Sequence, residues 1–232
     1  MLSAIAPCIA LTHASIQSCV CGENIVQVCK GTLTGIEAME KLTRGDLYSL
    51  EQYAERRQEF RARVMAHKKN RKLPIGPAAT LYFEDRLTVQ YQIQEMLRVE
   101  RIFEAAGIEE ELAAYNPLIP DGANWKATLM IEEPDVDKRR ELLARLVGIE
   151  GRVWVLVDGH ERVYAVADED LDRETEEKTS SVHFLRFEMS PAMIKDVKSG
   201  AALSIGIDHA NYMHRVEPVT ENVRAALLAD LS

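Results

Sequence analysis

Cysteine is scarce in this sequence, and its distribution excludes several kinds of chemistry. All four cysteines lie near the start of the chain, at Cys8, Cys19, Cys21 and Cys29. No CxxC pair occurs, so a thioredoxin-like site is absent, and the single CxC pair is a weak signature of a metal or cluster site. Because no cysteine follows Cys29, the rest of the chain cannot carry thiol chemistry or a cysteine-bound iron–sulfur cluster.

Long apolar runs and an excess of basic residues are also lacking. No apolar stretch is long enough to span a bilayer, and the short one over residues 5–11 has neither the basic flank nor the cleavage site of a signal peptide. The net charge of −9 argues against a dedicated nucleic-acid coat and against binding to an anionic membrane surface. We therefore expect a cytoplasmic protein with no membrane span and with partners other than nucleic acid.

The common catalytic signatures are missing as well. The sequence contains no P-loop GK[ST], no GxGxxG after a strand and no GxSxG nucleophile elbow. No histidine follows a glutamate by three positions, so the ExxH motif of di-iron helix bundles does not occur. These missing signatures leave the cofactor of the protein unknown.

What is present is the composition of a folded protein with an unusual first segment. The chain has 232 residues, of which 47% are hydrophobic and 28% are charged, as in soluble globular domains. Residues 1–38 carry only three charged side chains, and patterned sequence starts abruptly at Met39. We predict that residues 1–38 form a non-native or poorly ordered extension and that residues 39–232 form a single domain.

Hydrophobic periodicity predicts the order of the elements. Apolar side chains at helical spacings predict helices over residues 46–67, 85–106, 109–115, 134–147 and 191–199 and after Thr220. Alternating patterns predict strands over residues 79–83, 125–131, 152–158, 162–167, 182–189 and 203–207. Helices concentrate early and strands late, without regular alternation. We therefore predict an α+β fold with a largely antiparallel sheet, packed with amphipathic helices and helix-rich in its N-terminal half.

A cationic stretch is the sharpest electrostatic feature. Between residues 60 and 83 there is no acid, and the cations are Arg61, Arg63, Lys68, Lys69, Arg71 and Lys72. Cations at a helix end complement its dipole, but the same residues predict an anion site or a docking surface for an acidic partner. No aromatic residues are interleaved with these cations, which argues against nucleic-acid binding. The acidic run 168–177 is predicted to be a solvated face or a surface for a basic partner.

Two further groups of polar residues are candidates for a catalytic site. Tyr91, Glu95 and Arg98 are spaced so that they share one face of the helix 85–106. Glu95 and Arg98 either form a surface ion pair or, if buried beside Tyr91, include an acid or base with a shifted pKa. In the turn-rich loop 116–124, Asn116 and Asp121 either stabilise turns or line a pocket.

Histidines in the late strands suggest a metal hypothesis. Asp208, His209 and His214 follow one another closely, and strand pairing would bring His183 near them. Two or three imidazoles with one carboxylate are ligands that suit zinc or iron. The structural alternative is that His183, on an apolar strand face, is a hydrogen-bonded core residue.

Several stretches of the chain resemble the bacterial DUF3501 family. They are residues 63–103, the loop AYNPLIPDGANWKATLMIE, the run TEEKTSSVHFLRFEMSP and the strand GAALSIGIDH. The resemblance covers about residues 41–212 and implies Met39 as the usual start. Members of this functionally uncharacterised family are often encoded beside a rubrerythrin-like protein and an iron–sulfur oxidoreductase. The resemblance therefore implies these two proteins as partners and a role in redox or peroxide-stress defence.

Two hypotheses of function follow. The first is a non-catalytic accessory or interaction protein linked to redox or peroxide-stress defence. The alternative is a metal-dependent or small-molecule-binding enzyme, with a polar site formed by the helix 85–106, the loop 116–124 and the late strands. The sequence leaves open whether the protein is an enzyme.

Overall fold

The computed structural model describes residues 40–167 and 178–232. The predicted extension 1–38 and the acidic run 168–177 lie outside these residues and stay predictions. Among the described residues, no helix combines the length and the apolar character needed to cross a membrane.

The described residues form six α-helices, four short 3-10 turns and two sheets. The α-helices are α1 (Leu50–Lys68), α2 (Arg86–Glu100), α3 (Ala105–Tyr115), α4 (Val136–Arg145), α5 (Pro191–Lys198) and α6 (Glu221–Leu228). The 3-10 turns are η1 (Arg44–Asp46), η2 (Lys69–Arg71), η3 (Asn116–Leu118) and η4 (Glu150–Arg152). The strands are β1 (Lys72–Ile75), β2 (Ala79–Phe83), β3 (Asn124–Ile131), β4 (Val153–Val157), β5 (Val163–Tyr164), β6 (Val166–Ala167), β7 (Val182–Glu188), β8 (Leu203–His209) and β9 (Tyr212–Val216).

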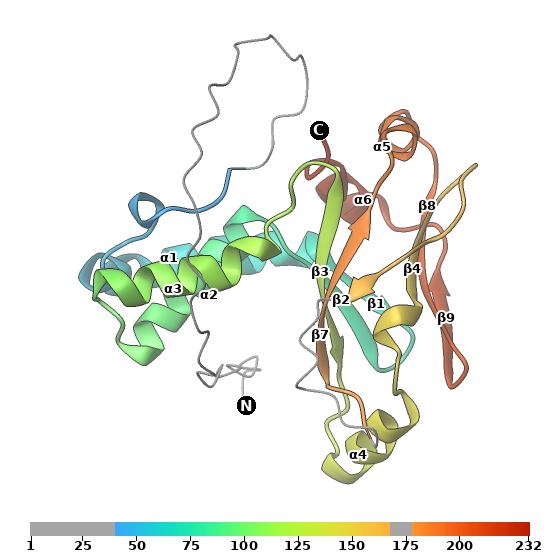
Figure 1. Ribbon diagram of the computed structural model, residues 1–232, viewed down its shortest axis with the longest axis horizontal. Coiled ribbons are helices and arrows are strands. Elements are labelled where there is room, and N and C mark those ends of the chain that lie inside the picture. Colours follow the sequence, from blue (N-terminus) through green and yellow to red (C-terminus); the bar gives the residue numbers. More distant parts are fainter. Residues whose placement is uncertain (1–39, 168–177) are drawn as a thin grey trace, which may run out of the picture. The chain divides into compact units, whose positions relative to one another are not determined.

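The strands form two antiparallel sheets that share one core (Figure 1). One sheet has the order β1-β2-β3-β7-β6 and the other the order β5-β4-β8-β9. Apolar side chains from both sheets, together with those of α5 and α6, belong to a single buried cluster. The predicted α+β class with antiparallel pairing is confirmed, but there are two sheets rather than one.

The division into two sheets occurs within the strand predicted over residues 162–167. Val163 and Tyr164 pair with β4, as the Asp158-Gly159 turn predicts, whereas Val166 and Ala167 pair with β7 of the other sheet. Each pairing is only two residues long. A uniform apolar alternation through this stretch gave no sign that the chain changes sheets at Ala165.

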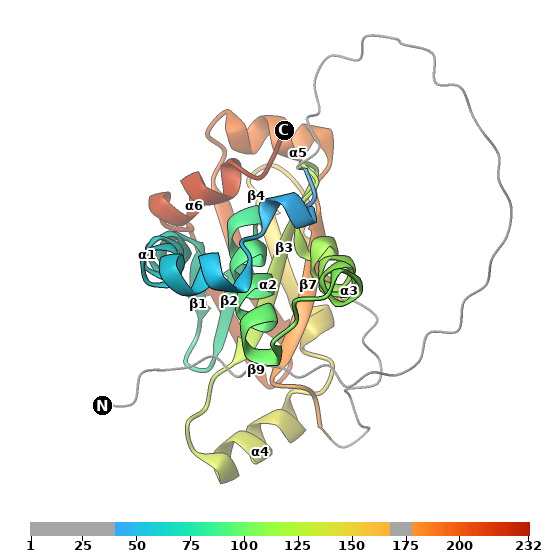
Figure 2. The same cartoon turned by 90° about the vertical axis from the view of Figure 1, so that its left-hand side faces the viewer.

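Helices α1, α2 and α3 lie beside the first sheet and have cores of their own (Figures 1 and 2). α2 buries Val89, Ile93 and Leu97 in a cluster shared with α3. α1 buries Tyr53 and Phe60 in another. In both views, α4 lies at the opposite end of the sheets from α5 and α6. The predicted concentration of helices in the N-terminal half is therefore present.

Three local differences from the predicted elements have physical causes. The predicted helix 85–106 ends at Glu100, because Arg101 adopts a left-handed backbone conformation with φ of 56° and its N–H bonds to the carbonyl oxygen of Leu97. Strands β1 and β9 were not predicted. β1 buries Leu73 and Ile75, but it is only four residues long and contains Pro74, which is rare inside strands. Most of β9 is exposed, so it shows no clear apolar alternation.

Candidate functional site

The cationic stretch and the Tyr91–Glu95–Arg98 face meet along the line where α1 packs on α2. The Phe60 and Tyr91 rings lie 6.1 Å apart between centroids, and Lys68 Nζ lies 5.9 Å from the Tyr91 ring centroid. Tyr91 also receives a hydrogen bond from Arg61. Two groups that the sequence presents separately thus form one site, which we call the α1–α2 seam.

Glu95 is the centre of the α1–α2 seam. Its carboxylate accepts hydrogen bonds from Arg57 Nε at 2.7 Å and Nη2 at 2.8 Å, from the Tyr53 hydroxyl at 2.7 Å and from Arg98 at 3.2 Å. Burial raises the pKa of Glu95, but these hydrogen bonds outweigh it and lower the pKa to about 2. Glu95 is therefore ionised at neutral pH and holds two guanidinium groups in place.

The two tyrosines of the α1–α2 seam stay protonated. Burial, together with the neighbouring Glu95 carboxylate, raises the pKa of the Tyr53 hydroxyl and of the Tyr91 hydroxyl. Neither phenol is therefore activated as a base or nucleophile. With Glu95 held as an anion, the arrangement suits binding through Arg61, Lys68 and Arg98 better than proton transfer.

Arg57 and Tyr53 were not among the predicted site residues. Both lie on the face of α1 that carries Phe60 and Val64, at helical spacings of three or four residues. This spacing was the signal in the sequence that could have found them. The acidic side chain to which they bind lies about forty residues further along the chain, on α2.

Exposed cations extend from the α1–α2 seam toward β1. Arg61, Arg63, Lys69 and Lys72 are exposed and Lys68 is partly so. We call these five residues the cationic face. Within the described residues, none of them forms an ion pair with a carboxylate.

Aromatic rings lie beneath three of these five cations, although no aromatic residue is interleaved with them in the linear sequence. The Arg63 guanidinium lies 4.9 Å from the Phe60 ring centroid, and Lys72 Nζ lies 5.2 Å from that of Tyr82. Tyr91 supports Lys68 in the same way. The rings come from other turns and other elements, so linear sequence showed no interleaving. Each such contact contributes about 0.5–1 kcal/mol at an exposed site and holds the cation outward.

Arg71 departs from the predicted docking surface. Its side chain is almost fully buried, and it donates hydrogen bonds to the carbonyl oxygens of Phe83 at 3.0 Å, Glu84 at 3.0 Å and Ala226 at 3.2 Å. It also forms an ion pair with Asp230. The turn η2 directs Arg71 inward, whereas its neighbours Lys69 and Lys72 are exposed. Arg71 is therefore buried and bonded within the chain, unlike its exposed neighbours.

A buried charge cluster surrounds Arg71. Asp85 lies 3.3 Å from the Arg71 guanidinium and is also paired with His67, which is partly exposed. Burial raises the pKa of Asp230 to about 6, although the adjacent Arg71 charge opposes this shift. The nearby Asp85 carboxylate, which shares the same guanidinium, adds to the rise in the pKa of Asp230. None of these acids was predicted as a site residue, because nothing in the sequence links Asp230 to Arg71.

The loop candidates Asn116 and Asp121 both hydrogen-bond within the chain. The Asn116 side chain accepts a hydrogen bond from the Leu42 backbone N–H at 2.8 Å and donates one to the Leu42 carbonyl oxygen at 2.9 Å. Asp121 accepts from the Ala123 N–H at 2.9 Å and from the Asn124 side chain at 2.8 Å. Asp121 therefore makes the turn-stabilising contacts of the structural alternative, whereas Asn116 holds a distant segment. Neither side chain hydrogen-bonds within the α1–α2 seam.

The structure places the predicted metal ligands on different sheets. His183 lies on β7 of the first sheet, is buried, and has the Thr179 hydroxyl 3.0 Å from its Nε2. Asp208 lies on β8 of the second sheet, where it accepts a hydrogen bond from the Tyr164 hydroxyl at 2.6 Å. Strand pairing therefore does not bring His183 beside Asp208.

The other two histidines also have separate surroundings. His209 Nε2 lies 3.1 Å from the Val147 carbonyl oxygen, and the His214 ring lies against Tyr212 with 4.5 Å between ring centroids. Over residues 40–167 and 178–232, no three His, Cys, Asp or Glu side chains gather as ligands for a metal ion.

Residues 41–231 match a family model described as a protein of unknown function, DUF3501. The chain belongs to the DUF3501 family. The resemblance seen in the sequence is thereby confirmed. A crystal structure of a "novel protein of unknown function" from Burkholderia pseudomallei K96243, at 1.90 Å resolution, is 53% identical, with a TM-score of 0.79. The match covers 83% of this chain and 100% of that one. Comparison with curated proteins yields no match.

Proposed function

We propose that this DUF3501 protein is a non-catalytic interaction protein whose cationic face docks an acidic protein partner. The observation that carries the proposal is the set of five cations without a carboxylate partner among the described residues. A guanidinium or ammonium group that is exposed and held by an aromatic ring is available to a carboxylate of another protein.

The helix dipole alone does not explain this distribution of charge. The favourable effect of a cation falls off within the last turn of a helix, where α1 has His67 and Lys68. Arg61 and Arg63 lie before that turn, and Lys72 lies beyond it on β1. A surface that is cationic on three successive elements is better matched to an external anion than to one helix end.

The family resemblance supplies the class of partner. We propose that the acidic partner is the rubrerythrin-like protein or the iron–sulfur oxidoreductase, and that the complex serves redox or peroxide-stress defence in the cytoplasm. The chain has a net charge of −9, so most of its surface repels an acidic partner while the cationic face attracts it. This difference orients the partner as it approaches.

The enzyme hypothesis has less support from the geometry. Tyr91 and Glu95 lie in the α1–α2 seam, whereas Asn116 holds the Leu42 backbone and His183 lies among the core strands. Glu95 is fully engaged by its hydrogen bonds and stays ionised. An acid–base site needs a group that exchanges a proton near the working pH, and Glu95, Tyr53 and Tyr91 do not meet this requirement.

The proposal is tested by measuring binding to the rubrerythrin-like protein and to the iron–sulfur oxidoreductase. The purified chain is titrated anaerobically with each protein, under reducing and under oxidising conditions. We expect the double variant Arg63→Glu and Lys69→Glu to weaken the wild-type association by about tenfold or more, and added salt to weaken it as well. These two cations are chosen because neither contacts Glu95.

The matched control reverses Lys195 and Lys198, two exposed cations in the last turn of α5, to glutamate. The control changes the net charge equally but leaves the cationic face intact, so its affinity should stay near that of the wild type. The proposal fails if the wild-type chain associates with neither protein in either redox condition. It also fails if both double variants lose affinity equally.

A further inference from the structure

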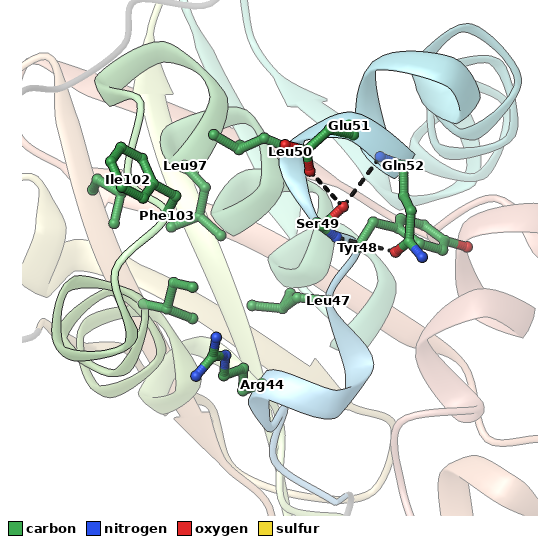
Figure 3. A pocket seen from close by; sticks show the side chains of 11 residues that line it. Arg44, Leu47, Tyr48, Ser49, Leu50, Glu51, Gln52, Leu97, Ile102 and Phe103 are labelled. Carbon is green, nitrogen blue, oxygen red and sulfur yellow. Dashed lines mark hydrogen bonds between the residues drawn. The ribbon is translucent and has the colours of Figure 1, made fainter.

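A pocket lies at the far end of the helical part, away from the cationic face. Its volume is about 400 Å³, and it is formed where η1 and the start of α1 approach the corner between α2 and α3 (Figure 3). This volume lies within the range of small-molecule sites, about 300–1,000 Å³. Its apolar walls are Leu47, Leu50, Leu97, Ile102, Phe103 and Ile108.

The corner between α2 and α3 leaves part of this apolar wall exposed. Phe103 is 70% exposed and Val99, one turn earlier, is 47% exposed. Arg101 has a left-handed backbone conformation and ends α2 just before Ile102. The chain turns there, and Phe103 borders the pocket. A phenylalanine this exposed gains little from folding alone, and a ligand that covers it would remove apolar surface from water.

One lining residue supplies an unused charge. Arg44 borders the pocket, and it forms no side-chain hydrogen bond or ion pair with any described residue. Figure 3 shows its guanidinium beside the space that Leu47 also borders. A guanidinium next to apolar walls is suited to a carboxylate or another planar anion.

Three other polar side chains of the pocket, those of Ser49, Glu51 and Gln52, are already engaged in hydrogen bonds. Ser49 donates a hydrogen bond to Glu51 at 2.9 Å and accepts one from the Gln52 N–H at 3.3 Å. Glu51 is an anion, because hydrogen bonds from its own backbone N–H and from Ser49 lower its pKa. Arg44 is therefore the lining cation that remains for a ligand, while Glu51 is held by the helix start.

We propose that this pocket binds a small amphipathic carboxylate. The apolar body would lie between Leu47, Leu97 and Phe103, and the carboxylate would pair with Arg44. The occupant is a free small molecule, because the pocket has the volume of a small-molecule site and Arg44 is its lining cation. This site is independent of the cationic face, so either proposal can fail while the other holds.

Three eight-carbon probes that differ only in the head group test the ligand class. Octanoate, octanol and octylammonium are titrated into the ¹⁵N-labelled chain, and the amide shifts of Leu47 and Phe103 report binding. We expect octanoate to bind about tenfold more tightly than octanol, and octylammonium more weakly still. Arg44→Gln should reduce the octanoate affinity to that of octanol and leave octanol unchanged.

Two further variants separate a pocket from a general surface effect. Leu47→Trp fills the pocket and should abolish binding of both octanoate and octanol. Arg140→Gln removes an exposed guanidinium on α4 and should leave the octanoate affinity unchanged, and the dispersed amide spectrum of every variant reports folding.

Several outcomes overturn the proposal. One is that the amide shifts do not approach saturation at about 5 mM octanoate, because the dissociation constant would then lie above the millimolar range. Another is octylammonium binding as tightly as octanoate, since the pocket would then not select a negative head group. A third is loss of protein association in Leu47→Trp when the wild type binds no octanoate, because the occupant would then be a side chain of another protein.

Discussion

Arg71 and Asp230 form a buried ion pair between residues 159 positions apart in the sequence, and both side chains are only 3% exposed. Arg71 follows α1, and Asp230 follows α6 at the end of the described chain. The same guanidinium also binds backbone carbonyls of β2 and α6. This one side chain therefore connects the helical part, the first sheet and the C-terminal helix.

Removing Arg71 should destabilise the protein strongly. In Arg71→Met the carboxylates of Asp230 and Asp85 lose their buried cation, which costs about 3–5 kcal/mol of unfolding free energy. Urea unfolding at pH 7 measures the loss. Arg63→Met, an exposed neighbour on α1, is the control and should change stability by less than about 1 kcal/mol. Similar effects of the two substitutions would contradict the assigned role.

Asp230 should make stability decrease as pH rises through its titration range. Burial raises its pKa to about 6 from the usual 3.8, so the folded state binds the proton more tightly than the unfolded state. The contribution is fully present below about pH 4 and is lost as pH rises through about 6. Asp230→Asn removes it. The stability difference between wild type and variant should change by on the order of 2 kcal/mol across this window, and parallel curves would refute the prediction.

Glu95 should have the opposite pH dependence. Its pKa is about 2 in the folded chain, compared with the usual 4.5, so its stabilisation is present above pH 4.5 and is lost as pH falls toward 2. Glu95→Gln should cost about 1–3 kcal/mol at pH 7, because Arg57 and Arg98 lose their charged acceptor. Below pH 4.5 the difference should shrink. Glu110→Gln, on exposed α3 surface, should be neutral at both pH values. A cost for Glu95→Gln that stays constant with pH would be inconsistent with this assignment.

Gly206 is required by the indole ring that lies over it. A Cβ at this position would lie 2.4 Å from Trp154 Cζ2 and 2.9 Å from the His214 carbonyl oxygen. Gly206→Ala should therefore cost about 1–3 kcal/mol, measured by urea unfolding followed by circular dichroism. Adding Trp154→Phe should recover part of the loss. Gly151→Ala, where a Cβ meets nothing within 4 Å, is the control and should cost less than Gly206→Ala. Equal losses at the two glycines would show that the indole contact is not the cause.

Local sequence patterns predicted most of the elements because their causes are local. The Asp158-Gly159 turn joins β4 to β5, and Ser190 caps α5, where its hydroxyl accepts a hydrogen bond from the Met193 N–H at 3.2 Å. The strand 79–83 has the predicted bounds. Edge strands β1 and β9 were not predicted. β1 is only four residues long and contains Pro74, and in β9 only Tyr212 is buried.

The candidate site was predictable only in part. The helical spacing of Tyr91, Glu95 and Arg98 correctly placed them on one face of a helix, but their partners Tyr53 and Arg57 come from α1. The same limit applies to the histidines, because sheet membership separates His183 from Asp208. Spacing describes one element at a time, whereas a site is formed by the packing of several.

The sequence by itself determined the family, the α+β class, the absence of cysteine chemistry after Cys29 and the run of cations after Phe60. Only the tertiary structure decided which of those cations stay at the surface. Arg71 is buried because carboxylates distant in sequence meet it, whereas Arg63 and Lys72 lie over aromatic rings and remain exposed. The reason is physical: a charge leaves water only where packing supplies its counter-charge and hydrogen bonds, and no local pattern contains that information.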